Sequence, residues 1–144
     1  MRVVFDTNIF ISALIFPGGK AEDAMMRIID GEDTLVISHE IIDEVLTVLA
    51  RKFSKDAEAL SRVAVNLANL GAIVRPAERL NVFEDEPDNR ILECAVAGSA
   101  AAIITGDKAM LTHKKHEHIR IITLSEFLGK GRDFRITGKK TSLR

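Results

Sequence analysis

The chain has few of the features that mark exported or membrane proteins. It holds one cysteine in 144 residues, so no disulfide can form within it. No stretch approaches the roughly 18 consecutive apolar residues that a membrane span needs, and no export signal is evident. We therefore expect a cytoplasmic protein that makes no use of a membrane.

Aromatic residues and net charge are also scarce. Tryptophan and tyrosine are absent, so few side chains are available to stack on nucleotide bases. The net charge is −1, but residues 130–144 hold six basic residues against Asp133, which gives them +5 and leaves −6 for the rest. We expect one domain over residues 1–129 and a basic C-terminal tail over 130–144, which is either part of that domain or partly disordered.

Short apolar runs alternate with helical patterns along the chain. The predicted strands are residues 3–5, 35–37, 72–74, 102–104 and 120–122. The predicted helices are residues 20–30, a segment capped by Ser38, residues 55–70 and residues 88–97. This alternation predicts an α/β fold with a mostly parallel sheet that helices cover on both faces.

Two of the predicted strands lead directly to an aspartate. Asp6 follows the first strand, and Asp107 follows the fourth strand after Thr105 and Gly106. The carboxyl ends of parallel strands meet at one edge of a sheet, where open α/β sheets bind ligands. We therefore expect the two carboxylates to lie at the same functional edge, although turn chemistry alone would also explain Asp6.

Two further acids lie in the predicted helices. Asp88 follows Pro87 and suits a helix N-cap, and Glu44 lies beside apolar positions of the helix after the second strand. A cap for Asp88 and a solvated helix face for Glu44 are the structural alternatives. Glu40 competes with Glu44 by charge and spacing. The acids that compete with Asp88 are Glu84, Asp85 and Glu86.

Four carboxylates at one edge would repel one another unless cations neutralised them. Sites made only of oxygen ligands suit Mg²⁺ or Mn²⁺. We predict a site for one or two such ions, in which the ligands and catalytic residues are Asp6, Glu44, Asp88 and Asp107.

The segments around these four acids resemble, in order, the motifs of PIN-domain nucleases, particularly the small prokaryotic toxins of toxin–antitoxin pairs. The segments are Val3–Ala13, Ser38–Leu46, Asp85–Ala95 and Ala102–Leu111. The resemblance implies a three-layer α/β/α sandwich with a five-stranded parallel sheet of order 3-2-1-4-5. It also implies metal-dependent cleavage of RNA, a cognate antitoxin and a homodimer. Asn8 and Thr105 match supporting polar positions of the family, with local turn bonding as the alternative.

The predicted function is hydrolysis of RNA phosphodiester bonds with water as the nucleophile, and the role is that of a toxin. One alternative is a PIN-like module that only binds RNA or a partner, and a housekeeping role in RNA processing is also open. Another is an aspartyl-phosphate phosphatase, which also starts from an aspartate after the first strand. Such phosphatases need a second acid two residues later, where this chain has Asn8.

Several basic residues are candidates for contacts to phosphates, with ordinary surface charge as the alternative. They are Arg51, Lys52, Lys55, Lys108, Lys114, Lys115 and the basic residues of the tail. His113, His116 and His118 lack the spacing of a zinc site, and we expect them in a solvated loop before the last strand.

Overall fold

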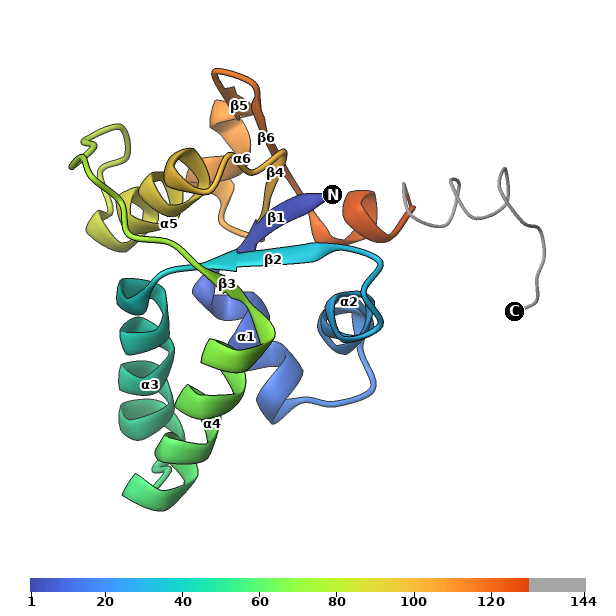
Figure 1. Ribbon diagram of the computed structural model, residues 1–144, viewed down its shortest axis with the longest axis vertical. Helices are drawn as coiled ribbons and strands as arrows, with labels where there is room; N and C mark the ends of the chain where they lie inside the picture. The colour runs from blue at the N-terminus through green and yellow to red at the C-terminus, as the bar shows by residue number, and fades with distance from the viewer. Residues whose placement is uncertain (130–144) are drawn as a thin grey trace.

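The computed structural model describes residues 1–129, so the predicted basic tail lies outside the described residues. The strands form one six-stranded sheet with the order β3-β2-β1-β4-β6-β5 (Figure 1). They are β1 (Arg2–Phe5), β2 (Thr34–Ile37), β3 (Ala72–Ile73), β4 (Ala102–Ile104), β5 (Lys115–His116) and β6 (Ile119–Ile122). Paired strands are parallel except for β5 and β6.

The predicted α/β class is confirmed, and the five parallel strands follow the predicted spatial order. The predicted number of strands is wrong, because β5 adds a short antiparallel edge in which Lys115 pairs with Arg120. A two-residue strand is too short to show the apolar alternation by which strands are recognised. The loop predicted for the histidines is therefore wrong in part: His113 ends a helix and His116 lies in β5.

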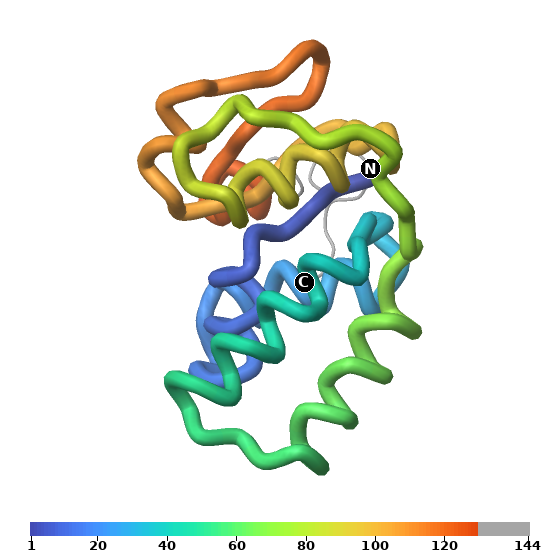
Figure 2. Tube along the Cα trace, turned by 90° about the vertical axis from the view of Figure 1, so that its left-hand side faces the viewer, coloured from blue at the N-terminus to red at the C-terminus, as the bar shows by residue number. Residues whose placement is uncertain are grey.

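Helices cover both faces of the sheet. They are α1 (Thr7–Ile15), α2 (Lys20–Ile29), α3 (His39–Phe53), α4 (Ala57–Leu70), α5 (Glu86–Ala97) and α6 (Lys108–His113), and residues 124–129 are also helical. Figure 2 shows β1 between a layer that holds α1 to α4 and a layer that holds α5 and α6, which confirms the three-layer sandwich.

The position of each helix follows from the order of the strands. The chain moves outward from β1 to β2 and β3, and then returns to β4 on the other side of β1. Because crossovers between parallel strands are right-handed, this reversal places the later helices on the opposite face. The gap between β1 and β4 is therefore the topological switch point, where open α/β sheets bind their ligands.

The ends of the helices follow local capping rules, with one correction. The Ser38 hydroxyl accepts a hydrogen bond from the N–H of Ile41 at 3.3 Å, which confirms the predicted cap of α3. Helix α5 begins at Glu86, two residues earlier than predicted, because proline is favoured in a first helical turn and Pro87 can lie there. Asp85 is the N-cap residue, so the structural alternative in which Asp88 caps this helix is wrong.

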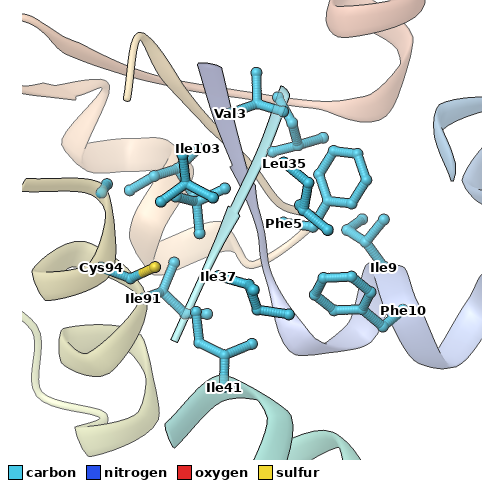
Figure 3. Close-up of a cluster of buried hydrophobic side chains, with 14 of the residues drawn as sticks. Val3, Phe5, Ile9, Phe10, Leu35, Ile37, Ile41, Ile91, Cys94 and Ile103 are labelled. Atoms are coloured by element: carbon cyan, nitrogen blue, oxygen red, sulfur yellow. The ribbon is translucent and has the colours of Figure 1, made fainter. Parts of the chain in front are cut away.

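Buried aromatic and aliphatic side chains join the layers (Figure 3). The ring centroid of Phe5 lies 5.7 Å from that of Phe10 and 5.9 Å from that of Phe127, distances typical of favourable aromatic pairs. Cys94 is fully buried as a free thiol, and burial raises its pKa to about 12, so the predicted role as a small apolar residue is confirmed. A Cβ on Gly98 would lie 2.2 Å from Cγ1 of Val36, so the end of α5 can approach β2 only with glycine there.

Within residues 1–129, no helix combines the length and the apolar character that crossing a bilayer requires.

Candidate functional site

Asp6 leaves β1 at the switch point and is held there by a threonine from the next strand. Its side chain is 7% exposed, and its Oδ2 accepts a hydrogen bond of 2.6 Å from the Thr105 hydroxyl. Thr105 follows β4 and is fully buried. The same Thr105 oxygen accepts a hydrogen bond of 2.9 Å from the N–H of Asp107. One hydroxyl therefore fixes the positions of both strand-end aspartates relative to each other.

Asp107 is the N-cap residue of α6. Its Oδ1 accepts a hydrogen bond of 3.0 Å from the N–H of Met110, which sets the orientation of the carboxylate. Asp107 is therefore both a helix cap and a member of the acidic group described next. A capping role does not remove a carboxylate from a site, because each carboxylate has a second oxygen.

Three carboxylates converge beyond the carboxyl edge of β1 and β4. Asp85, Asp88 and Asp107 each place an oxygen within 4.8 Å of the other two, and we call these three residues the acidic cluster. Asp88 is 5% exposed, and its Oδ2 is buried without a hydrogen-bond partner among residues 1–129. Leaving a buried acceptor unpaired costs about 1–3 kcal/mol, and more when it is charged. A bound cation would remove that cost.

The electrostatics of the site reflect crowding of like charges. Burial raises the pKa of Asp88 to about 7, and the charges of Asp107, Asp6 and Asp85 add to this effect. Burial also raises the pKa of Asp6, although hydrogen bonds from Thr105 and the backbone of Thr7 offset part of the rise. The negative charges of Asp107 and Asp85 contribute to it. The site therefore holds excess negative charge that a cation can neutralise.

Glu44 is not one of the three members of the acidic cluster. It is half-buried and borders a hollow of about 160 Å³ between α3 and α5. The hollow is lined by Thr7, Glu40, Ile41, Glu44, Glu86, Pro87, Arg90 and Ile91. Glu40, which competes with Glu44 for the predicted role, forms an ion pair with Arg79: its Oε2 lies 2.8 Å from Nη2 of Arg79.

The two supporting residues differ in their placement. Thr105 makes the hydrogen bonds described above, as the prediction for a supporting residue requires. Asn8 is exposed on the first turn of α1, and its side chain makes no hydrogen bond within residues 1–129. The structure therefore gives Thr105, but not Asn8, a hydrogen bond to a site aspartate within residues 1–129.

The sequence placed Asp85 only among the rivals of Asp88 and missed the contacts that fix it. Asn89 is 1% exposed. Its Oδ1 accepts hydrogen bonds from the N–H groups of Val82 (3.0 Å) and Phe83 (2.8 Å). Its Nδ2 donates a hydrogen bond to the carbonyl of Phe83 (2.8 Å). The buried Glu93 accepts a hydrogen bond of 2.7 Å from the N–H of Leu80. These contacts bind residues 80–83 to α5, just before Asp85.

A signal for these contacts was present in the sequence. Asn89 and Glu93 stand four residues apart, and so on one face of a helix, next to the apolar run that begins at Ile91. Buried polar side chains are nearly always hydrogen-bonded, so polar residues on an apolar helix face indicate a specific partner. The identity of that partner depends on how the preceding loop crosses the helix.

The donor set of this site fits a hard divalent cation. It consists of carboxylate oxygens with no histidine or cysteine among them, and such sets suit Mg²⁺ or Mn²⁺ rather than softer metals. The unpartnered Oδ2 of Asp88 is the atom that most clearly lacks a ligand.

Comparison with known proteins agrees with the fold. A family model described as PIN domain matches residues 2–109. The uncharacterised protein MJ1680 of Methanocaldococcus jannaschii is 29% identical over 140 residues, which cover 89% of this chain and 90% of that protein.

Solved structures share the fold at low sequence identity. One is the crystal structure of VapBC2 from Rickettsia felis bound to a DNA fragment from the VapBC2 promoter. A chain of that structure aligns with a TM-score of 0.62 and 14% identity, over 85% of this chain and 98% of that one. A chain of VapBC-1 from nontypeable Haemophilus influenzae aligns with a TM-score of 0.60 and 16% identity over 87% of this chain and 99% of its own length. Because the family model spans most of the sheet and every residue of the acidic cluster, the chain belongs to the PIN domain family.

Proposed function

We propose that this protein is an endoribonuclease that depends on a divalent metal ion and hydrolyses RNA phosphodiester bonds. PIN domains are in general nucleases, and the chain belongs to that family. The observation that carries the proposal is the buried, unpartnered Oδ2 of Asp88 inside a group of three converging carboxylates. A structural role for Asp88 would supply that oxygen with a donor, whereas a metal site would leave it for the ion.

The residues proposed to hold the ion are Asp6, Asp88 and Asp107, with Asp85 as an additional ligand and Glu44 reaching the site from α3. The proposed ion is Mg²⁺ or Mn²⁺, with one or two bound. When bound, such an ion activates water as a nucleophile and stabilises the charge that develops on the phosphate. The roles of these residues follow from their positions at the switch point and from the family motif.

The chain's own contribution is to orient the carboxylates before substrate arrives. The Thr105 hydroxyl donates to Asp6 and accepts from the backbone of Asp107, so neither strand-end aspartate has to reorganise. Asn89 holds the segment before Asp85 against α5. The proposed entry path of the phosphodiester is the hollow between α3 and α5 that Glu44 borders.

Cleavage of single-stranded RNA by the purified protein tests this proposal. We expect cleavage with Mg²⁺ or Mn²⁺, none with EDTA, and a rate about 1,000-fold lower for Asp6→Asn, since a ligand and a developing charge interaction are lost together. Asp43→Asn is the matched control, because Asp43 is exposed on α3 next to Glu44. Full activity of wild type in EDTA, or of Asp6→Asn in Mg²⁺, would refute metal-dependent cleavage at this site.

Metal binding provides a second readout that does not depend on the choice of RNA. Calorimetric titration of the metal-free protein with Mn²⁺ should show one or two bound ions. Asp88→Asn should weaken that binding at least about tenfold, because it removes the ligand atom that has no other partner. Equal Mn²⁺ affinity in wild type and Asp88→Asn would contradict the proposed ligand set.

We also propose that the protein is the toxin of a type II toxin–antitoxin pair and forms a homodimer. Two structures that share its fold are VapBC assemblies. Four large apolar side chains of α1, α2 and the segment between them are exposed, which favours a protein partner on this side: Leu14, Phe16, Met26 and Ile29. Growth arrest on expression, relieved by co-expression of a neighbouring small gene, would support the toxin role, and harmless expression would contradict it.

A further inference from the structure

The surface between α6 and β5 combines aromatic rings with exposed basic side chains, and the site described above uses none of them. The ring of His113 lies with its centroid 5.2 Å from that of Phe83, in an edge arrangement. It also lies 6.2 Å from the ring of His116, at an interplanar angle of 26°. His113 is exposed and His116 is half-buried. Phe83 is buried, and its ring packs against that of His113. We call these three residues the imidazole platform.

Three lysines lie near the imidazole platform along the chain, and the carboxylate of Glu117 lies 3.9 Å from Nε2 of His116. Lys108, Lys114 and Lys115 are exposed, and none of them makes an ion pair within residues 1–129. Across the strand pair, Lys115 stands directly opposite Arg120, which is also exposed. Like charges opposite each other on neighbouring strands destabilise a sheet. An anion bound along this edge would offset that repulsion.

The platform is joined to the acidic cluster by two short covalent routes. Asp107 caps the N-terminus of α6 and His113 is the last residue of the same helix, so about 9 Å of helix separates them. Phe83 lies two residues before Asp85, and Asn89 clamps this segment to α5. Figure 1 shows α6 and β5 grouped at the end of the molecule next to α5. The platform and the acidic cluster are therefore held as neighbours.

We propose that the imidazole platform is a nucleobase-stacking subsite, which receives a base of a single-stranded RNA whose backbone passes the acidic cluster. This inference rests on the proposed function and names the part of the substrate that this surface contacts. Unpaired bases stack on aromatic rings, histidine included, and exposed lysines next to those rings attract the phosphates. The chain has no tryptophan or tyrosine, so imidazole rings provide this contact.

A second aromatic pair in the chain provides a matched comparison. The rings of Phe16 and Phe53 have centroids 6.3 Å apart, and Arg51, Lys52 and Lys55 lie close to Phe53 in sequence. Phe16 is exposed, and this pair is formed at the C-terminal ends of α1 and α3, away from the strand edge that carries Asp6. This pair also combines two aromatic rings with basic residues nearby in sequence, but it has no short connection to the acidic cluster. We therefore expect it to make no contribution to RNA binding.

The test measures RNA affinity without cleavage, using the full chain with Asp88→Asn and fluorescence anisotropy in Mg²⁺. The probes are a single-stranded RNA 12-mer and the same 12-mer with abasic riboses. His113→Ala should raise the Kd for the base-containing RNA about tenfold, the size of one lost stacking contact. It should change the Kd for the abasic RNA less than twofold. His113→Phe should restore binding. Phe53→Leu, which removes one ring of the second pair but keeps an apolar side chain, should leave the Kd unchanged.

Each other outcome has a defined meaning. An equal loss on both RNAs would show that His113 acts through charge and would overturn stacking, as would an unchanged Kd for His113→Ala or the absence of RNA binding. RNA cleavage by wild type together with histidine-independent binding would overturn this inference alone. Histidine-dependent stacking without cleavage by wild type would overturn the proposed function alone.

Discussion

Two aspartates at opposite edges of the sheet are almost equally buried but have opposite surroundings. Asp33 precedes β2 and is 6% exposed, whereas Asp88 lies beyond the other edge and is 5% exposed. Asp33 accepts hydrogen bonds from the N-terminal ammonium group of Met1 at 2.8 Å and from Nε of Arg27 at 2.8 Å. Asp88 has three acidic neighbours and an oxygen without any donor. Burial alone therefore does not distinguish a structural acid from a functional one.

The charged neighbours of each aspartate distinguish the structural acid from the functional one. Asp33 is surrounded by positive charge, which offsets the loss of its hydration, so it contributes to the fold. Asp88 has lost its hydration among like charges, so it lowers the stability of the metal-free protein. Glu93 resembles Asp33, because Arg90 lies 2.6 Å and Arg79 3.2 Å from its oxygens. An unfavourable arrangement of this kind is typical of a site that binds something else.

The largest expected effect is on the free energy of unfolding when each of these two aspartates is replaced by asparagine. Asp33→Asn should lower the free energy of unfolding by about 2 kcal/mol, because the N-terminal ammonium group and the half-buried Arg27 lose the carboxylate that both contact. Arg27 retains the more distant carboxylate of Glu32, at 3.9 Å. Asp88→Asn should leave the stability of the metal-free protein unchanged or raise it. Urea denaturation of both variants in EDTA measures this difference. A similar loss of stability in the two variants would refute the distinction between the two acids.

A smaller effect concerns pH. The pKa of Asp88 in the folded protein is about 7, above the value near 3.9 of an unfolded chain, so the folded state binds the proton more tightly. The stabilisation that protonated Asp88 contributes is therefore fully present below about pH 4 and is lost as the pH rises from about 4 to 7. The raised pKa of Asp6 acts in the same direction.

Denaturation of metal-free wild type and Asp88→Asn at pH 4.5 and 7.5 isolates this contribution. Wild type should lose more stability than the variant over this interval, and added Mn²⁺ should restore the stability of wild type at pH 7.5. Parallel losses in the two proteins would show that Asp88 is not the group responsible.

The elements that the sequence predicted well are those with strong local signals. The buried strands ending at Phe5 and Ile104 are continuous apolar runs, and Ser38 caps α3 by a contact three residues away. Asp6 and Asp107 could be placed together because the end of a parallel strand determines where the next residue emerges. These inferences needed no knowledge of distant contacts.

The remaining features depend on contacts between segments that are distant in sequence or too short to form a pattern. Asp85 joins the acidic cluster because Asn89 and Glu93 hold the preceding loop against α5, and no local rule states that path. β5 exists only by pairing with β6. Glu44 was predicted from family resemblance, and the structure places it at the hollow between α3 and α5 rather than among the three members of the cluster.

The smallest expected effect comes from a substitution that removes one hydroxyl and leaves every carboxylate in place. Thr105→Val keeps the shape of the side chain but deprives Oδ2 of Asp6 of its donor, so Asp6 comes to resemble Asp88. Because that hydrogen bond lowers the pKa of Asp6, its loss should move the acidic limb of the pH–rate profile to higher pH. We expect RNA cleavage near neutral pH to fall about tenfold, which is about 1.4 kcal/mol.

Thr105→Ser distinguishes the hydrogen bond from the packing of the methyl group. Serine retains the donor, so it should recover the wild-type pH profile and most of the rate even if it costs some stability through the lost methyl. If Thr105→Ser showed the same displaced profile as Thr105→Val, the hydroxyl would not be what positions Asp6. The orientation of the strand-end carboxylates would then depend on the backbone at the switch point, where the N–H of Asp6 donates to the carbonyl of Ile104 at 3.0 Å.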